Sequence, residues 1–254
     1  MASPDRAVGV DGCRQGWLMV EATLGEGVVD VRLLPDFAQV IGAAAGAPVA
    51  VDMPVGLVDA PRRSADVAAR RALPGRASSV FAAPPRPVIT ALRRGEVDDH
   101  AGASALARSL TGQGLSMQTW RICPKVAEVD AVAADVEPTD LWEVHPEVSF
   151  AAMALGAPLA RKRTYAGVRQ RLDLLAASSL VVPATARGTD AVAPDDVLDA
   201  MACCWTALAL ASGEALVPLP DPPTETDGDR PIAIWTRHRP RRPAPGAATT
   251  RVPA

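Results

Sequence analysis

The sequence contains few cysteines and no long apolar run. Its cysteines are Cys13, Cys123, Cys203 and Cys204, and no two of them have the spacing of a CxxC metal motif. This usage is typical of a reduced intracellular protein. The first residues lack the apolar stretch of a signal peptide, and no segment approaches the roughly 18 apolar residues that span a membrane. We therefore expect a cytoplasmic protein.

The sequence also lacks an excess of charge of either sign. Its 26 basic and 29 acidic residues give a net charge of −3, which alone is no reason to expect nucleic acid as a partner. The distribution is uneven, because residues 61–94 contain eight arginines and one acid, Asp66. A second basic run comprises Arg161, Lys162, Arg163, Arg169 and Arg171. Each run fits either a solvated helix face or a phosphate-binding surface.

The length and the apolar content indicate a folded α/β protein. The chain has 254 residues, of which 48% are hydrophobic, so it can bury a sizeable core. We find no internal repeat and no second core. We therefore predict one domain over residues 1–238, with a helical insertion over about 56–138. The tail at 239–254 is rich in Pro, Arg and Ala, and we expect it to be disordered.

Strand patterns fall mainly in the first part of the chain. The predicted strands there are Ala7–Val10, Trp17–Ala22, Val28–Leu34 and Pro48–Asp52. Short connections between the first three predict an antiparallel meander. Later strands are expected at Asp140–His145 and Ile232–Trp235.

Helical periodicity separates and follows these strands. The predicted helices are Asp36–Ala45, Arg62–Ala72, Val88–Arg94, Gly102–Leu110, Ile122–Ala134, Pro146–Leu155, Lys162–Ser178 and Pro194–Ser212. Proline is too frequent in Ala77–Pro87 for a regular element there. Residues 218–231, rich in proline and acids, are expected to form a loop.

Several acids occupy strand ends or one helix face. Asp11 follows the first predicted strand, Asp52 ends the fourth, and Glu143 lies within the fifth. Asp196 and Asp199 are three residues apart and so share a face of the late helix. Each acid alone fits a turn or a cap. The predicted topology, however, brings these positions to one place, which indicates a shared site.

Clustered carboxylates repel one another unless cations lie between them. Oxygen-rich sites of this kind suit Mg²⁺ or Mn²⁺. Two such ions about 3.5–4 Å apart can hydrolyse a phosphodiester bond. The metal-ligand candidates are Asp11, Asp52, Glu143 and Asp196, and Asp199 joins them as a candidate catalytic residue.

Other residues are candidates for catalysis or substrate binding. His145 shares a strand face with Glu143 and can be a general acid or base, a metal ligand or a structural residue. Lys162 can neutralise a phosphate or belong to a solvated helix face. The loop residues Arg76, Ser78, Ser79 and Arg86 can grip a phosphate or form a rigid proline-rich loop. Gln118, Trp120 and Lys125 can form a nucleotide platform, or Trp120 can be core and Lys125 can pair with Glu128.

Several sequence blocks resemble the DUF429 family. They are VGVDGCRQGW (8–17), AVDMPVGL (50–57), RASSVFAAPPR (76–86), SMQTWRICPKVAEVD (116–130), EVHPEVSF (143–150), the K-x-T of Lys162–Thr164 and DDVLDAMACCWTA (195–207). That family is described as a predicted nuclease with an RNase H fold. The resemblance implies an RNase H-like mixed β-sheet flanked by helices, with the insertion after the fourth strand.

The resemblance also implies roles for the acids. Asp11 matches the metal-binding Asp that RNase H-like and resolvase-like enzymes carry on the first strand. Asp52 matches a middle-strand acid, where resolvase-like enzymes usually place Glu. Asp196 and Asp199 match acids of the closing helix, and Glu143 is an additional ligand.

Three functions are consistent with these features. The first is a metal-dependent nuclease or phosphodiesterase that acts on DNA or RNA. The second is a phosphotransferase or ATPase of related fold, which needs a second such domain and a glycine-rich adenosine site that the sequence does not show. The third is a non-catalytic nucleic-acid-binding module, whose binding survives the loss of metal. The fold alone does not choose among them.

Overall fold

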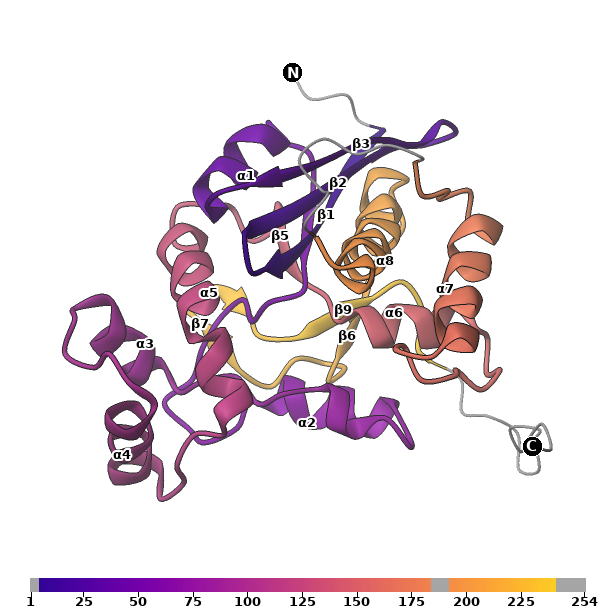
Figure 1. The fold of residues 1–254 in the computed structure, drawn as a ribbon. Coiled ribbons are helices and arrows are strands. Elements are labelled where there is room, and N and C mark those ends of the chain that lie inside the picture. The colour runs from indigo at the N-terminus through magenta and orange to yellow at the C-terminus, as the bar shows by residue number, and fades with distance from the viewer. Residues whose placement is uncertain (1–4, 184–191, 241–254) are drawn as a thin grey trace.

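The computed structural model, which describes residues 5–183 and 192–240, is built on a five-stranded mixed sheet (Figure 1). Strands β1 (Arg6–Cys13), β2 (Gly16–Thr23) and β3 (Gly27–Leu34) form the antiparallel meander that the sequence predicts. Strands β4 (Val49–Val51) and β5 (Leu141–Glu143) run parallel to β1, which gives the order β3-β2-β1-β4-β5.

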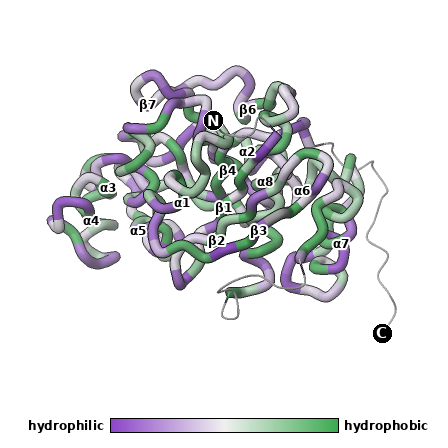
Figure 2. Tube along the Cα trace, turned by 90° about the horizontal axis from the view of Figure 1, so that it is seen from above, coloured by the Kyte–Doolittle hydropathy of each residue, from purple (hydrophilic) through white to green (hydrophobic). Residues whose placement is uncertain are grey.

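Helices cover both faces of this sheet. On one face lie α1 (Phe37–Ala44) and α5 (Met117–Ala133), and Phe37, Cys123 and Val126 share a buried cluster with Trp17. On the other face lies α8 (Pro194–Ala211), flanked by α6 (Pro146–Met153) and α7 (Tyr165–Ala177). Figure 2 shows the hydrophilic segments mainly at the periphery, on α4 and α7 among others. The expected α/β fold with a mixed sheet flanked by helices is confirmed.

The remaining elements surround one edge of the sheet. The helices are α2 (Ser64–Ala72), η1 (Ala77–Ser79), α3 (Arg86–Arg93) and α4 (His100–Thr111). The short strands are β6 (Val217–Leu219), β7 (Thr226–Asp227), β8 (Arg230–Pro231) and β9 (Ile234–Thr236). Strand β6 pairs with β9 and β7 with β8, both antiparallel. Helix α2 packs on β6 and β9 through a small apolar cluster that includes Ala65, Ala69, Ile232 and Ile234.

Several predicted boundaries or regions are wrong. The helix expected at Ile122–Ala134 begins at Met117, because Ser116 caps it by accepting a hydrogen bond from the Thr119 amide. Strand β1 does not end before Asp11 but continues to Cys13, because the tight hairpin pairs Asp11 with Leu18 and Cys13 with Gly16. Helix α7 does not include Lys162, because Thr164 caps it by accepting a hydrogen bond from the Gly167 amide. The expected loop at 218–231 contains parts of three strands, each too short to show a periodic pattern.

Two expectations, one about the C-terminal tail and one about membrane-spanning segments, can be compared with the described residues only in part. Most of the tail predicted to be disordered, residues 241–254, lies outside the described residues. Within residues 5–183 and 192–240, no helix combines the length and the apolar character that crossing a membrane requires.

Gly9 allows α8 to dock on the centre of the sheet. A Cβ atom at Gly9 would lie 2.1 Å from the backbone nitrogen of Cys204 and 2.2 Å from the carbonyl oxygen of Ala200. Backbone atoms cannot rotate away as a side chain can, so any side chain at this position forces the helix off the strand. The close approach places Asp199, the residue before Ala200, beside the end of β1.

We expect Gly9→Ala to lower the free energy of unfolding by about 1–3 kcal/mol, because overpacked interiors cost that much. Urea denaturation followed by circular dichroism measures the change. The matched control is Gly42→Ala in α1, where an added Cβ meets no atom within 4 Å. If Gly9→Ala is as stable as this control, the described docking of α8 is wrong.

Candidate metal centre

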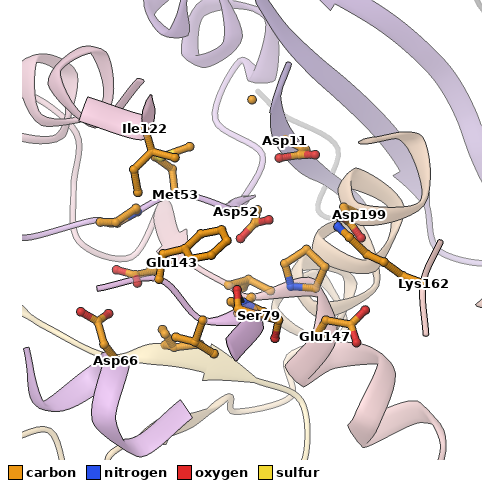
Figure 3. Close-up of a pocket in the computed structure, with 18 of the residues that line it drawn as sticks. Asp11, Asp52, Met53, Asp66, Ser79, Ile122, Glu143, Glu147, Lys162 and Asp199 are labelled. Carbon is orange, nitrogen blue, oxygen red and sulfur yellow. Dashed lines mark hydrogen bonds and ion pairs between the residues drawn. The ribbon is translucent and has the colours of Figure 1, made fainter. Parts of the chain in front are cut away.

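Three aspartates from separate elements meet at the end of the sheet. Val10 on β1 pairs with Val51 on β4, so the next residues, Asp11 and Asp52, lie side by side. Helix α8 crosses over β1 and adds Asp199 (Figure 3). One carboxylate oxygen of each aspartate lies within 4.8 Å of one oxygen of each of the others. Asp11, Asp52 and Asp199, called the aspartate cluster below, come from three segments distant in sequence.

Burial and mutual repulsion dominate the electrostatics of the aspartate cluster. Burial, followed by the charges of Asp52 and Asp199, raises the pKa of Asp11 well above its usual value. Burial and then the charge of Asp199 raise the pKa of Asp52 in the same direction. Burial also raises the pKa of Asp199, although Lys162 opposes this effect. The three carboxylates are therefore costly to ionise together without a compensating cation.

Lys162 supplies part of the compensating charge. Its Nζ atom lies 2.7 Å from Oδ2 of Asp199. Three carboxylates and one ammonium leave a formal charge of −3 + 1 = −2, which one divalent cation balances. Oδ1 of Asp199 is buried and has no hydrogen-bond partner in the described part of the chain. An acceptor left open in this way suits a metal ion, and an all-oxygen donor set suits Mg²⁺ or Mn²⁺.

The aspartate cluster lies in a cavity of about 300 Å³. Lys162 and Arg163 line it, together with His145. Apolar side chains, including Met53, Val80, Phe81 and Ile122, also line it. A phosphate group that enters this cavity would meet both the aspartate cluster and the basic residues.

Asp196, predicted as a metal ligand, lies outside the aspartate cluster. It is in the first turn of α8, one turn before Asp199, and is partly exposed. Burial, with the charges of Asp195 and Asp199, raises the pKa of Asp196 to about 6. Its charge also raises the pKa of Asp11, so it lies close enough to act on the site electrostatically.

Glu143, also predicted as a ligand, is held by a buried arginine instead. Its Oε1 and Oε2 atoms accept hydrogen bonds from Arg63 at 2.6 and 2.7 Å, and Oε2 also accepts from the amide of Val55 at 2.7 Å. Arg63 binds Asp66 at 2.6 Å as well. Both carboxylate oxygens are thus occupied, and Glu143 connects β5 to α2 rather than joining the aspartate cluster.

His145 lines the cavity with one ring nitrogen open. Its Nε2 atom lies 3.2 Å from the carbonyl oxygen of Ser79. A carbonyl only accepts, so Nε2 carries the proton and Nδ1 keeps a lone pair. Nδ1 is buried, without a hydrogen-bond partner among the described residues. Burial lowers the pKa of His145, so the ring is neutral at neutral pH.

Three of the four loop candidates for phosphate binding line one hollow beside the acidic cavity, and the fourth lies elsewhere. Arg76, Ser78 and Ser79 line that hollow, and Ser79 also lines the acidic cavity. Arg76 donates to Glu147 and to the carbonyl oxygen of Leu159. Arg86 lines a different cavity and pairs with Asp130 and Asp227.

The predicted nucleotide platform does not line the acidic cavity. Gln118 is exposed, and Trp120 packs against two apolar clusters of the core. The Nζ atom of Lys125 lies 4.5 Å from the ring centre of Trp17 and 3.4 Å from Glu128. The alternative interpretation, with Trp120 in the core and Lys125 paired with Glu128, fits this geometry.

A buried ion pair between Glu147 and Arg171 was not predicted from the sequence. Oε1 of Glu147 accepts from Nε and Nη2 of Arg171 at 3.1 and 2.6 Å, and Arg76 binds the other oxygen. The position of Arg171 could have indicated this ion pair, because Arg171 lies midway between Gly167 and Leu175 on the buried face of α7. A basic residue on a helix face that otherwise packs inward indicates a buried partner.

The raised pKa values predict how the stability of the metal-free protein depends on pH. The folded protein keeps protons on these carboxylates at pH values where the unfolded chain, with its aspartates near 3.8, has lost them. The free energy of unfolding contributed by these groups therefore falls as the pH rises above about 4, and for Asp196 the fall is complete above about 6. Urea denaturation in EDTA at pH 5 and pH 7.5 should show a smaller fall for Asp52→Asn than for wild type. Equal falls would contradict the coupling within the cluster.

Comparison with known proteins gives one match. A family model described as a protein of unknown function, DUF429, matches residues 9–225. Neither a curated protein nor a solved structure matches the chain.

Proposed function

The chain belongs to the DUF429 family, and from that premise we propose that it is a metal-dependent nuclease or phosphodiesterase of RNase H-like fold. Its substrate would be nucleic acid, either DNA or RNA. The observation that carries the proposal is the convergence of buried Asp11 and Asp199 with half-buried Asp52, with one oxygen each within 4.8 Å of the others. The stability of the fold gains nothing from three adjacent acids of which two are buried, so their convergence favours a metal-binding role.

The fold supports the RNase H-like part of the proposal. An antiparallel meander precedes two strands parallel to β1, and acids occur on the first strand, after the fourth, and on a late helix packed against the sheet. These are the places where RNase H-like enzymes carry their acids. Cytoplasmic location is part of the same proposal, supported by four cysteines that are all buried and free.

The residues present fit Mg²⁺ or Mn²⁺ as the cofactor. Asp11, Asp52 and Asp199 would hold the ion, and Asp196 adds negative charge one helical turn away. A bound ion of this kind can activate water and stabilise a leaving oxygen.

Two further side chains of the cavity, Lys162 and His145, would take part in the reaction. Lys162 carries a positive charge against Asp199 and would bind a non-bridging phosphate oxygen, where developing charge is stabilised. His145 presents Nδ1 as a neutral acceptor in the same cavity and would accept a proton. Neither task requires a residue from outside the cavity.

The proposal is tested by incubating the wild-type protein with labelled single-stranded, duplex, hybrid and junction substrates of DNA and RNA. We expect cleavage of at least one substrate with Mg²⁺ or Mn²⁺ and none with EDTA. A folded protein that binds Mn²⁺ in calorimetry but cuts no substrate would overturn the nuclease assignment. Strand binding that is unchanged by EDTA, without cleavage, would favour a binding module, and phosphate transfer from ATP would favour a phosphotransferase.

A further inference from the structure

A second hollow, of about 1110 Å³, opens beside the acidic cavity. One wall comes from residues 72–79 and the other from residues 157–164. Ser79, Lys162 and Arg163 line both hollows. The second hollow, called the groove below, therefore adjoins the aspartate cluster and has room for more of a substrate than the acidic cavity alone.

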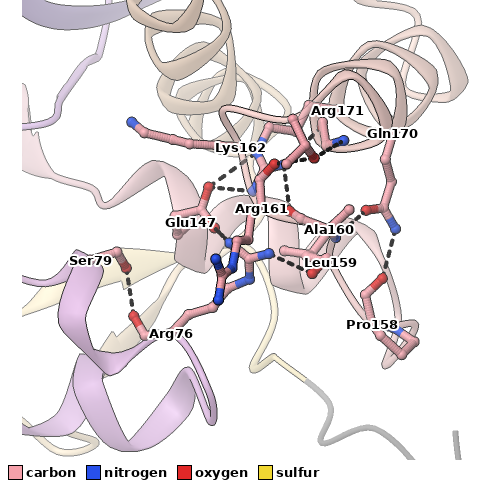
Figure 4. Close-up of polar contacts among 12 residues, drawn as sticks. Arg76, Ser79, Glu147, Pro158, Leu159, Ala160, Arg161, Lys162, Gln170 and Arg171 are labelled. Carbon is pink, nitrogen blue, oxygen red and sulfur yellow. Dashed lines mark hydrogen bonds and ion pairs between the residues drawn. The ribbon is translucent and has the colours of Figure 1, made fainter. Parts of the chain in front are cut away.

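The loop of residues 157–164 is held firmly in place (Figure 4). Gln170 accepts from the amide of Ala160 at 2.7 Å and donates to the carbonyl oxygen of Pro158 at 2.8 Å. Arg76 and Arg171 donate to the carbonyl oxygens of Leu159 and Ala160. Arg76 and Arg171 are themselves fixed by buried Glu147.

The start of α7 presses against the same loop. A Cβ atom at Gly167 would lie 1.9 Å from the carbonyl oxygen of Arg161, so only glycine permits this approach. Preorganisation of this kind lowers the ordering cost of binding.

The firmly held loop presents two cations that no described residue neutralises. Arg161 and Arg163 are exposed, and neither guanidinium forms a hydrogen bond or an ion pair within residues 5–183 and 192–240. Lys162, between them, binds Asp199. By contrast, Arg63, Arg76 and Arg171 are committed to carboxylates. Of the basic residues that line the groove, only Arg161 and Arg163 are thus left without a partner among the described residues. Arg62 and Arg71 of the first basic run are also exposed, but they line a different hollow.

The cavity offers an aromatic surface to a single strand. Phe81 lines it and is 45% exposed, whereas Phe37 and Phe150 are fully buried. Unpaired bases stack on such rings, whereas the bases of a duplex are already stacked and paired. A volume of about 300 Å³ is at the lower limit for small-ligand pockets and does not admit a duplex.

We propose that residues 157–164 are a preorganised phosphate-binding loop, whose Arg161 and Arg163 hold a single nucleic-acid strand in the groove while Phe81 stacks on a base. This role depends on the proposed nuclease function and names its substrate class as single-stranded nucleic acid. The two arginines hold adjacent phosphates, and the phosphodiester bond next to them lies over the aspartate cluster.

The test measures the affinity of the EDTA-treated protein for a labelled single-stranded oligonucleotide by fluorescence anisotropy at several salt concentrations. Arg161→Ala/Arg163→Ala should bind about tenfold more weakly, since a charged hydrogen bond is worth at least that factor. Its salt dependence should fall by about 1.4 in log–log slope, roughly 0.7 for each lost phosphate contact. Phe81→Ala should weaken binding by about fivefold or more, and Phe81→Tyr should retain it.

The matched control is Arg94→Ala/Arg169→Ala, which removes the same charge from exposed arginines outside the groove. If both double variants lose the same affinity for the strand, the effect is due to net charge alone and the proposed role of the loop is wrong. Tighter binding of a duplex than of the single strand would overturn the substrate class. Effective competition by a polyglutamate peptide would assign the groove to an acidic protein instead.

Calorimetry with Mn²⁺ separates this inference from the proposed function. The Arg161→Ala/Arg163→Ala protein should bind Mn²⁺ as the wild type does, because neither arginine belongs to the aspartate cluster. If this variant binds the strand normally and the wild type shows metal-dependent cleavage, the proposed role of the loop is wrong and the nuclease function is retained. Loss of strand binding in the variant, with no Mn²⁺ binding by the wild type, would overturn the nuclease function and leave the loop as a strand-binding element without a catalytic role.

Discussion

Asp11→Asn is expected to abolish metal-dependent cleavage and, at the same time, to make the metal-free protein more stable. The amide keeps the size of the side chain but cannot carry the charge that a cation requires. Loss of a direct ligand should lower Mn²⁺ affinity by at least about a hundredfold, since even groups that only orient ligands are worth 10–100-fold. Isothermal titration with Mn²⁺ and a cleavage assay measure the two losses.

Although the variant loses activity and metal affinity, its metal-free form should gain stability. The reason is that the aspartate cluster costs free energy when no cation is bound. Burial and the charges of Asp52 and Asp199 oppose ionisation of Asp11, and the substitution removes that opposition. With saturating Mn²⁺ the order should reverse, since a ligand at 100 times its Kd stabilises the wild type by about 2.7 kcal/mol. Thermal unfolding in EDTA and in Mn²⁺ measures this reversal.

The control for Asp11→Asn is Asp30→Asn on β3 of the same sheet. Asp30 is partly exposed and pairs with Arg32 at the surface, so its loss should change neither Mn²⁺ affinity nor the order of stabilities. If Asp11→Asn destabilises the metal-free protein and binds Mn²⁺ normally, Asp11 is a structural residue and the metal centre is wrong.

Arg63→Ala should lower the free energy of unfolding by about 3–5 kcal/mol, because it leaves buried carboxylates without their cation. The side chains of Arg63, Asp66 and Glu143 are each at most 5% exposed. Arg63 donates to both oxygens of Glu143 and to both oxygens of Asp66, so water cannot readily replace it. Urea denaturation measures the change, and the neighbouring, exposed Arg62→Ala is the control.

Glu143→Gln distinguishes this ion network from a metal ligand. If Glu143 acts through Arg63, the amide variant loses stability but binds Mn²⁺ within about twofold of wild type, a change of less than about 0.5 kcal/mol. A large fall in Mn²⁺ affinity would return Glu143 to the metal centre. A stability cost below about 0.5 kcal/mol for Arg63→Ala would instead show that the network contributes little.

The sequence by itself determined the order of the main elements and pointed to all three clustered acids, Asp11 and Asp52 as metal ligands and Asp199 as a catalytic candidate. Alternating apolar residues predict β1 to β3, and strand-end positions point to Asp11 and Asp52. The three-residue spacing on α8 points to Asp199 as a partner. These features follow from periods, caps and turns, whose physics acts over a few neighbouring residues.

Tertiary packing alone decided which charged groups share the site. Arg63 reaches Glu143 across 80 positions and holds it apart from the aspartate cluster. Lys162, expected within a helix, lies before α7 and contacts Asp199, 37 positions away. Asp196 stays outside the cluster, although it lies on the same helix as Asp199. The partner of a buried charge depends on which backbones approach closely, as Gly9 permits for α8, and on which desolvated groups must then be balanced, so no local pattern encodes it.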